Sequence, residues 1–301
     1  MSNYSQNKIV DDPNHVWNRL ANMIEDGSEV MDVGCSSGNF GENLIAKKGC
    51  IVDGVELDSS DAKIASKKLR NVWNLNIEQL VNLKKLRNKY DVVVFADVLE
   101  HLYSPSDTLR AVKRLLKPGG RIIFSIPNMA HISVRLNLLG GDFVYTDTGL
   151  LDKTHLHFYD FNAIKTVFKD ANMYLTSIDG VVYGYPDKLI HDKLGKLGFQ
   201  AEEQGMRLLR DPSSSIFQYV GSAEYGNRDE EVKINSQMPV LSQDIQNLVN
   251  ELQNKDEKVK DLHKRIDDLL RQIDVIEHST TFRVGNFLTR LPRAMKARFK
   301  R

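Results

Sequence analysis

Residues 30–41 read VMDVGCSSGNFG, and this stretch decides how the rest of the chain is interpreted. Its first four residues, 30–33, are mostly apolar and predict a short buried strand. Gly34 and Gly38 follow, and apolar residues then recur at helical spacing. Glycine tolerates positive φ and lets a ligand approach the main chain, while the first N–H groups of a helix lack intrahelical partners. The stretch therefore predicts a strand, a tight ligand-facing turn and a helix.

Two acidic residues near this turn indicate which ligand it suits. A second apolar run, residues 51–55, ends on Glu56, which lies 22 residues after Gly34. An acid at the end of a second strand can accept hydrogen bonds from both hydroxyls of a ribose. The turn lacks the GxGxxG pattern that seats a pyrophosphate, and Asp32 precedes its first glycine. A carboxylate there repels pyrophosphate and suits an ammonium group, which favours S-adenosylmethionine (SAM) over NAD or FAD.

Five segments, in this order, resemble the class I SAM-dependent methyltransferases: DVGCSSG (32–38), GVELD (54–58), NIEQL (76–80), DVVVFADVLEHL (91–102) and LLKPGGRIIFSIPN (115–128). The resemblance implies an α/β, Rossmann-like, mostly parallel sheet of seven strands with helices on both faces. The chain departs from the family at Ser36, where many members have glycine. It departs again at Asn76, where an aspartate usually faces the adenine amino group, although an amide oxygen can accept the same hydrogen bond.

The resemblance also implies which residues bind the cofactor. They are Asp32, Gly34, Cys35, Ser36, Gly38, Glu56, Leu57, Asn76, Ile77, Ala96 and Asp97. The alternation of apolar strands with helical patterns supports this set independently, because it predicts a parallel sheet whose ligands lie at the carboxyl ends of the strands. Several of these residues fall where such strands end.

Composition restricts the cellular setting. The two cysteines, Cys35 and Cys50, indicate a reducing compartment, and no signal peptide or membrane-spanning run is evident. Seven of the 41 basic residues lie in residues 279–301, which contain no acid, so the remainder carries 34 basic against 40 acidic residues. An acidic body without a basic stripe argues against nucleic-acid binding. We expect a cytoplasmic protein.

Residues 129–160 interrupt the alternation of strands and helices. The segment is too long for a plain connector, and long loops at the ligand end of such folds are usually functional. It resembles a segment of bacterial methyltransferases of the surface-polysaccharide type. That resemblance implies an O-methyltransferase acting on a hydroxyl of a saccharide or lipid-linked saccharide in cell-surface glycan biosynthesis. The matching residues are Tyr145, Asp147, Gly149, Leu150, Leu151, Asp152, Thr154, His155, Leu156 and Phe158.

A sugar hydroxyl is a poor nucleophile, so a general base beside it is expected. Histidine has a suitable pKa, and His155 and His157 lie in this segment on either side of Leu156. We select His155 as the base and Asp152 as the acid that orients it, and a structural role for both histidines stays open. No spacing predicts a metal site, although His155, His157 and Asp152 are an alternative set of ligands for a divalent ion.

The chain beyond the catalytic domain, which we place at residues 1–227, has a different pattern. A polar linker (228–240) leads into residues 241–278, where ten of eleven heptad seam positions are apolar. The pattern predicts a parallel coiled-coil homodimer, and the alternative is one amphipathic helix packed on the domain. The seam positions are Ile245, Leu252, Val259, Ile266 and Ile273, with Leu241, Leu248, Lys255, Leu262, Leu269 and Ile276.

The tail, residues 279–301, interleaves basic and large apolar residues and suits an anionic lipid surface. This favours a peripheral position on the inner face of a membrane, with a disordered basic tail or a nucleic-acid contact as the alternatives. Two other functions remain open. One is a methyltransferase for a small metabolite such as a phenol or an amine. The other is a coiled-coil scaffold that recruits a glycosyltransferase, with methylation secondary or lost.

Overall fold

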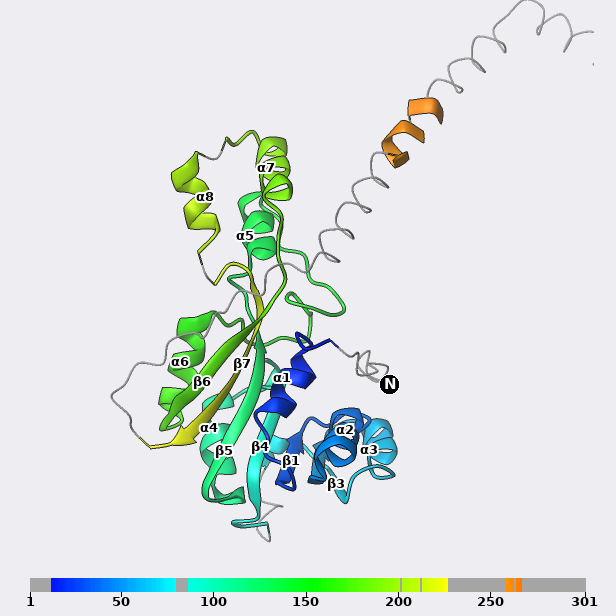
Figure 1. Ribbon diagram of the computed structural model, residues 1–301, viewed down its shortest axis with the longest axis vertical. Coiled ribbons are helices and arrows are strands. Elements are labelled where there is room, and N and C mark those ends of the chain that lie inside the picture. The colour runs from blue at the N-terminus through cyan, green and yellow to red at the C-terminus, as the bar shows by residue number, and fades with distance from the viewer. Residues whose placement is uncertain are drawn as a thin grey trace, which may run out of the picture. The chain divides into compact units, whose positions relative to one another are not determined.

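A computed structural model describes residues 12–79, 86–200, 202–211, 213–226, 258–262 and 264–266 (Figure 1). The chain divides into two compact units, residues 1–238 and 239–301. The first unit contains the sheet and its helices. Its end at residue 238 lies within the linker expected from the sequence, and residues 227–257 are outside the described residues.

One sheet of seven strands forms the centre of the first unit, in the order β3-β2-β1-β4-β5-β7-β6. The five strands from β3 to β5 are parallel, whereas β7 lies antiparallel between β5 and β6. The expected Rossmann-like, mostly parallel sheet of seven strands is confirmed. The strands are β1 (Glu29–Val33), β2 (Ile51–Glu56), β3 (Asn71–Asn74), β4 (Tyr90–Ala96), β5 (Leu116–Pro127), β6 (Met173–Val182) and β7 (Ile216–Tyr225).

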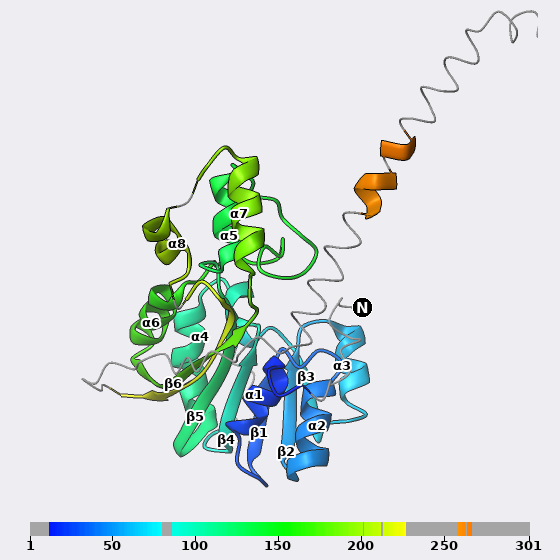
Figure 2. The same ribbon diagram turned by 45° about the horizontal axis from the view of Figure 1, so that its top comes forward.

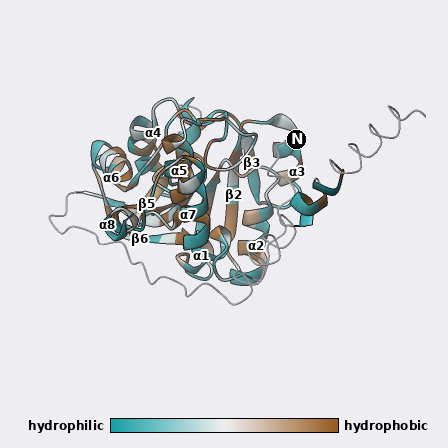
Figure 3. Ribbon diagram, turned by 90° about the horizontal axis from the view of Figure 1, so that it is seen from above, coloured by the Kyte–Doolittle hydropathy of each residue, from teal (hydrophilic) through white to brown (hydrophobic). Residues whose placement is uncertain are grey.

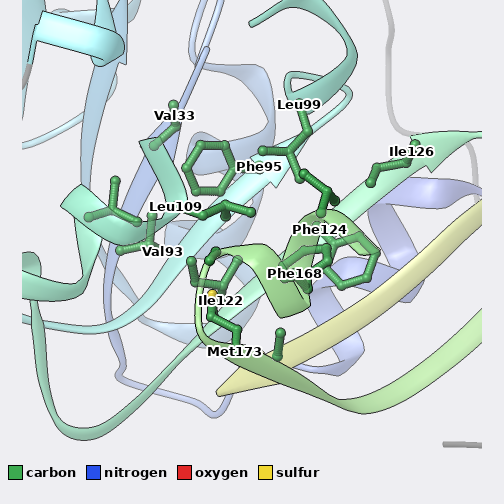
Figure 4. Packing of buried hydrophobic residues seen from close by; sticks show 14 of the residues in the cluster. Val33, Val93, Phe95, Leu99, Leu109, Ile122, Phe124, Ile126, Phe168 and Met173 are labelled. Carbon is green, nitrogen blue, oxygen red and sulfur yellow. The ribbon is translucent and has the colours of Figure 1, made fainter. Parts of the chain in front are cut away.

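Helices cover both faces of the sheet because successive residues of a strand point to opposite sides. Val93 and Phe95 of β4 join the core beneath α4 and α6, and Phe124 of β5 lies 4.5 Å from Phe168, ring to ring (Figure 4). Val92 and Val94 join the opposite core, beneath α1, α2 and α3. These helices are α1 (Val16–Asn22), α2 (Asn39–Lys48), α3 (Ser59–Ala65), α4 (Pro105–Val112) and α6 (Phe161–Asp170).

The hydropathy of the elements follows this layering. Seen from above, β2 is coloured brown between helices whose ribbons carry teal stretches (Figure 3). Apolar residues on both sides of a strand are expected where both faces of a parallel sheet are covered.

Several elements have other bounds than the apolar pattern of the sequence predicts. The pattern predicts a third strand over residues 72–77, but β3 ends at Asn74, and residues 77–79 form a 3-10 turn. It predicts a fifth strand over 120–126, but β5 already begins at Leu116. It predicts a strand over 175–178, but β6 runs over Met173–Val182, because its whole length pairs with β7. A helix predicted over 78–88 falls mostly on residues 80–85, which lie outside the described residues.

A small helical layer lies beyond the carboxyl end of β5 (Figures 1 and 2). It consists of α5 (Ile132–Leu139), α7 (Asp187–Lys196) and α8 (Glu203–Leu209). The three helices share a small core of their own. The short amphipathic pieces expected within residues 183–215 are therefore α7 and α8. The core residues are Ile132, Leu136, Ile190, Leu194 and Met206.

Within the predicted coiled coil, the structure describes only residues 258–262 and 264–266, which are helical. Three seam residues among them, Val259, Leu262 and Ile266, are about half exposed at 49%, 52% and 51%. The rest of the heptad run and the whole basic tail lie outside the described residues. Among the helices that are described, none has the length and apolar character needed to cross a membrane.

Candidate functional site

A cavity of about 500 Å³ opens at the carboxyl edge of the parallel strands. Residues that follow β1, β2, β3 and β4 line it, which is where the strand order predicts a ligand. Ten of the eleven predicted cofactor-binding residues are among the lining residues. The exception is Gly38, which instead begins α2 in the left-handed region at φ 78° and packs against the backbone of Ala65.

The turn after β1 is built for close backbone approach. Gly34 has φ 70°, and a Cβ added there would lie 2.7 Å from Cγ2 of Val98. Any side chain at this position would therefore strain the backbone and clash with the opposite wall of the cavity. Ser36 has φ 45°, a conformation that side chains disfavour, which explains why glycine suits this position in the family.

Glu56, at the end of β2, fixes the shape of this turn. Its carboxylate accepts hydrogen bonds from the backbone N–H of Ser36 at 2.8 Å and from that of Asp58 at 2.7 Å. A second contact joins the Ser36 hydroxyl to Asp61 at 3.2 Å. A carboxylate has about four acceptor positions, so Glu56 retains capacity for a ribose hydroxyl while it holds the turn.

Asp32 is the acid that the sequence places before the first glycine. It is 2% exposed, and its Oδ2 atom has no hydrogen-bond partner within the described part of the chain. Burial, aided by the negative charge of Glu56, raises the pKa of Asp32 to about 7. A buried carboxylate oxygen without a donor is costly, and a cationic or N–H donor ligand would remove that cost.

These features fit SAM. The unpartnered oxygen of Asp32 suits the amino group, Glu56 suits the ribose, and the bare backbone at Gly34 leaves room between them. Asn76 and Ile77 line the same cavity, and the side-chain oxygen of Asn76 accepts a hydrogen bond from the backbone of Glu78 at 2.9 Å.

Asp97 lies on the opposite wall, directly after β4. It adopts φ 55°, which is unusual for a residue other than glycine. Ser125 donates its hydroxyl to Asp97 at 2.8 Å, and Gln218 of β7 donates its side-chain amide to the same oxygen. Burial raises the pKa of Asp97, although these two hydrogen bonds oppose the shift. Two strands thus hold a carboxyl group at the cavity wall.

His101, four residues further on, also lines the cavity. Its Nδ1 lies 3.1 Å from the carbonyl oxygen of Thr154 and 3.2 Å from the Thr154 hydroxyl. Because a carbonyl oxygen only accepts, the proton of the neutral imidazole is assigned to Nδ1, which leaves Nε2 with a lone pair. The ring is thereby oriented by the segment that the sequence singled out.

The three residues proposed for catalysis lie behind this histidine. His155 is buried at 7% exposure, its ring centroid is 4.8 Å from that of His101, and it does not line the cavity. Asp152 is also buried and accepts hydrogen bonds from the backbone and hydroxyl of Thr154. His157 stacks against Tyr159 at 6.0 Å. The structure brings His155 and Asp152 into one cluster and leaves both off the cavity wall.

Glu100 completes this cluster. It is 1% exposed, and neither of its carboxyl oxygens has a hydrogen-bond partner among the described residues. Burial, followed by the charges of Asp97 and Asp152, raises the pKa of Glu100 well above its usual value. Glu100, His101 and His155 offer ligand atoms within 4.8 Å of one another, a donor set that would suit a divalent transition metal ion. Spacing along the sequence predicted no such grouping.

Other lining residues were not predicted. Trp17 comes from α1, Tyr103 follows His101, and Gln218 comes from the last strand. In the sequence, the helical spacing of Trp17 indicates only a packing residue, so nothing there marks it as part of the site. Nothing local marks Gln218 as a site residue, since its position depends on β7 pairing beside β5.

The comparison with known families decides the class. Residues 9–178, more than half of the chain, match a family model described as a methyltransferase domain. The chain belongs to this methyltransferase family. With the cavity above, this establishes a SAM-dependent methyltransferase, and SAM is its cofactor.

Two curated relatives of this methyltransferase carry the same name. Over 131 residues it is 32% identical to the ubiquinone biosynthesis O-methyltransferase of Pasteurella multocida, covering 39% of this chain and 54% of that protein. Over 171 residues it is 27% identical to the protein of the same name from Xanthomonas oryzae pv. oryzae, covering 52% and 67%. The methyltransferase spans about half the length of the first of these relatives.

Among solved structures, this methyltransferase resembles a SAM dependent methyltransferase from Archaeoglobus fulgidus. The two share 19% sequence identity with a TM-score of 0.49, over 69% of this chain and 92% of that one.

Proposed function

We propose that this methyltransferase transfers the methyl group of SAM to a hydroxyl group of a saccharide, with His101 as the general base. The observation that carries the proposal is the oriented imidazole at the cavity wall. Thr154 fixes the proton on Nδ1, which leaves the Nε2 lone pair to accept the proton of an acceptor hydroxyl. The proposed base is therefore His101 rather than His155, whose ring packs against it.

The remaining residues position the two reactants. SAM, when bound, supplies a methyl group on a positively charged sulfur. Asp32 and Glu56 hold its two polar ends, and the bare turn at Gly34 allows close approach. Leu102 and Tyr103 line the cavity wall beside His101. Holding donor and acceptor in line within a dry cavity supplies much of the catalysis in such transfers.

His155, Glu100 and Asp152 act behind the base. His155 has its pKa lowered by burial and then by His101, so it is neutral near pH 7. Its ring is buried, does not line the cavity and packs against His101, so it is out of reach of a substrate while it holds that ring in place. The role we assign to His155 is therefore to position His101, through the ring contact of 4.8 Å.

The test is incubation of the full chain with labelled SAM and fractionated membrane glycans. Label in a saccharide fraction, released as an O-methyl sugar on hydrolysis, supports the proposal. Label that appears only in protein or small-molecule fractions contradicts it. His101→Ala serves as the inactive control for each fraction.

A second candidate acceptor is a small phenol. The names of the curated relatives favour it, since those proteins are called ubiquinone biosynthesis O-methyltransferases. The same base would serve a phenol, whose hydroxyl is more acidic than that of a sugar. Parallel assays with a catechol and with the glycan fractions separate the two, because only one acceptor class should saturate at low concentration.

We also propose that the chain is a homodimer through residues 241–278. Leu262 and Ile266 occupy successive seam positions and are about half exposed, which leaves both side chains accessible to a second helix. Light scattering on the full chain and on a chain ending at residue 240 tests this. A mass that equals one chain in both cases contradicts the dimer.

Two further proposals rest on sequence alone. We propose that the tail, residues 279–301, holds the protein on the cytoplasmic face of a membrane, and that a glycosyltransferase is a partner of the coiled coil. Flotation with anionic and neutral vesicles tests the first, and co-purification tests the second. Binding of SAM, measured by calorimetry, would exclude the alternative function in which the chain is only a scaffold, because a scaffold without a cofactor site would not bind SAM.

A further inference from the structure

Three aromatic side chains gather on the loop between α5 and α6. Phe143 lies 5.4 Å from Tyr145 and 5.9 Å from Phe158, and Tyr145 lies 6.4 Å from Phe158, ring to ring. Phe143 and Tyr145 are 41% and 54% exposed. We call these three residues the aromatic platform. Exposed rings that contact one another mark a surface for a ligand rather than for the core.

The platform stands on an ordered loop. The backbone N–H of Thr146 donates to Leu151 at 2.8 Å, and that of Lys153 donates back to Thr146 at 3.0 Å. Leu150 and Leu151 are buried beneath it at 7% exposure each. An ion pair of 2.6 Å between Lys153 and Asp147 closes the outer side. The rings are therefore presented from a fixed turn, which lowers the entropic cost of binding.

The same loop is joined to the wall of the SAM cavity. The backbone N–H groups of Leu156 and His157 both donate to the carbonyl of Glu100, at 2.8 and 3.1 Å. Ring contacts continue the connection, since Phe158 lies 6.2 Å from His155, and His155 lies 4.8 Å from His101. The platform thus has a fixed position relative to the proposed base.

We propose that the aromatic platform is a subsite for a sugar ring of the acceptor, one or more residues away from the ring that is methylated. This inference rests on the proposed function and specifies its substrate as an oligosaccharide. The C–H bonds on one face of a pyranose carry partial positive charge, which suits the negative face of an aromatic ring. Phe158 contacts His155, which in turn contacts His101, whereas the ring contacts of Phe143 and Tyr145 within the described residues are with each other and with Phe158. The two outer rings are therefore one ring contact further from His101 than Phe158 is.

The surroundings of the platform favour a glycan over a lipid tail or a bare phenol. Residues 141–149 are all exposed, and the pair Phe143 and Tyr145, with Val144 between them, is flanked by Asp142 on one side and by Thr146, Asp147 and Thr148 on the other. Carboxylates and hydroxyls beside a stacking ring can bond to the equatorial hydroxyls of a sugar. A hydrocarbon chain would gain nothing from these polar groups.

The test measures binding and transfer separately. The probes are tetrasaccharides of glucose, galactose, mannose, rhamnose and N-acetylglucosamine, each beside its monosaccharide, in the presence of S-adenosylhomocysteine. Phe143→Ala and Tyr145→Ala should weaken tetrasaccharide binding roughly tenfold, the upper range for one stacked ring. Monosaccharide binding should not change. Phe199→Ala removes a comparably exposed aromatic residue whose ring contacts none of the three platform rings, and it is the matched control.

Phe143→Leu separates stacking from general apolar contact, because it keeps a large side chain without a ring, and it should weaken binding nearly as much as Phe143→Ala. Binding that is unaffected in all platform variants, or absent for every tetrasaccharide, overturns the subsite. Methyl transfer to a tetrasaccharide that the platform variants leave intact supports the methyltransferase and overturns the subsite. Platform-dependent binding without transfer to any saccharide retains the subsite and overturns saccharide methylation.

Discussion

The imidazole rings of His101 and His155 lie 4.8 Å apart, centroid to centroid, at an interplanar angle of 66°. The first ring lines the cavity, and the second is buried behind it. One histidine is therefore available to a substrate, while the other packs the first in place. This relationship assigns the two residues different effects on turnover.

His101→Ala should lower kcat about a hundredfold or more, the usual effect of losing a general base. SAM affinity, measured by calorimetry, should stay within about twofold of the wild type, since Asp32 and Glu56 are untouched. His155→Ala should lower kcat less and should shift the pH profile of the remaining base. The exposed His191 on α7 supplies a neutral control. If His155→Ala were the more damaging change, the base would be His155 as the sequence predicted.

Asp32 should make SAM binding depend on pH. Its pKa is raised to about 7, so the carboxylate that pairs with the ammonium group is mostly protonated at lower pH. We expect binding to be roughly tenfold weaker at about pH 6 than above pH 7, and Asp32→Asn to bind weakly with little pH dependence. Equal SAM affinity of the wild type at both pH values would show that the ammonium group of SAM does not pair with the negative charge of Asp32.

The same shift affects the stability of the cofactor-free protein. A carboxyl whose folded pKa is raised binds its proton more tightly when folded, so stability falls as pH rises from about 4 through about 7. Asp32→Asn removes this penalty, which amounts to at most about 4 kcal/mol for such a shift. The variant should have a higher free energy of unfolding than the wild type at about pH 8 and a similar one at about pH 4. Urea titration at the two pH values measures the difference.

Gly34→Ala should abolish SAM binding while the fold persists. The new Cβ would meet Val98 at 2.7 Å in a backbone conformation with φ 70°. Gly195, in the helix α7, has no atom within 4 Å of the same added carbon. Gly195→Ala should therefore leave binding unchanged and stabilise the protein by about 0.5–1 kcal/mol. Calorimetry with SAM and thermal melts of the Gly34→Ala and Gly195→Ala variants test this. SAM affinity retained in Gly34→Ala would show that the ligand does not approach the backbone at Gly34.

Asp53 should be the main acid-sensitive element of the fold. This fully buried carboxylate accepts hydrogen bonds from Arg70, Lys89 and Tyr90. Burial alone would raise its pKa, yet these partners hold the pKa far below its usual value. A lowered folded pKa contributes stability above about pH 4 that is lost as pH falls further.

Asp53→Ala should therefore lower the free energy of unfolding by about 3–5 kcal/mol at neutral pH, because the hydroxyl of Tyr90 and the charges of Arg70 and Lys89 lose their partner. Asp107, in an exposed pair with Arg110, is the matched control, and Asp107→Ala should cost less than about 1 kcal/mol. Denaturant melts at pH 7 and at about pH 3 measure both. If Asp53→Ala lowered the free energy of unfolding equally at both pH values, the proposed link between the lowered pKa of Asp53 and the pH dependence of stability would be wrong.

Much of the cofactor site was predictable because its parts are local. Asp32, Gly34 and Glu56 each lie at the end of an apolar run, and parallel strands bring such ends to one edge of the sheet. The acceptor side was not predictable in this way. His101 is oriented by Thr154, 53 residues later in the chain, and Gln218 reaches Asp97 only because β7 enters between β5 and β6.

The sequence led to His155 as the base and did not point to His101, which shows the limit of prediction from sequence. Both histidines lie in segments that the pattern placed near the ligand, and residue type alone gives them the same chemistry. Only the packing of Leu156 and His157 against Glu100 turns the loop so that His155 lies beneath His101. Periodicity carries no information about which of two such rings is buried.

By itself the sequence determined the sheet, its helices on both faces, the glycine turn and the acids beside it, because strand periodicity and turn chemistry act over a few residues. The tertiary structure alone decided which histidine faces the cavity, how Glu100 came to be buried without a hydrogen-bond partner among the described residues, and where the aromatic platform stands. These depend on contacts between segments far apart in the chain, whose free energies are realised only when the sheet and the loop pack together.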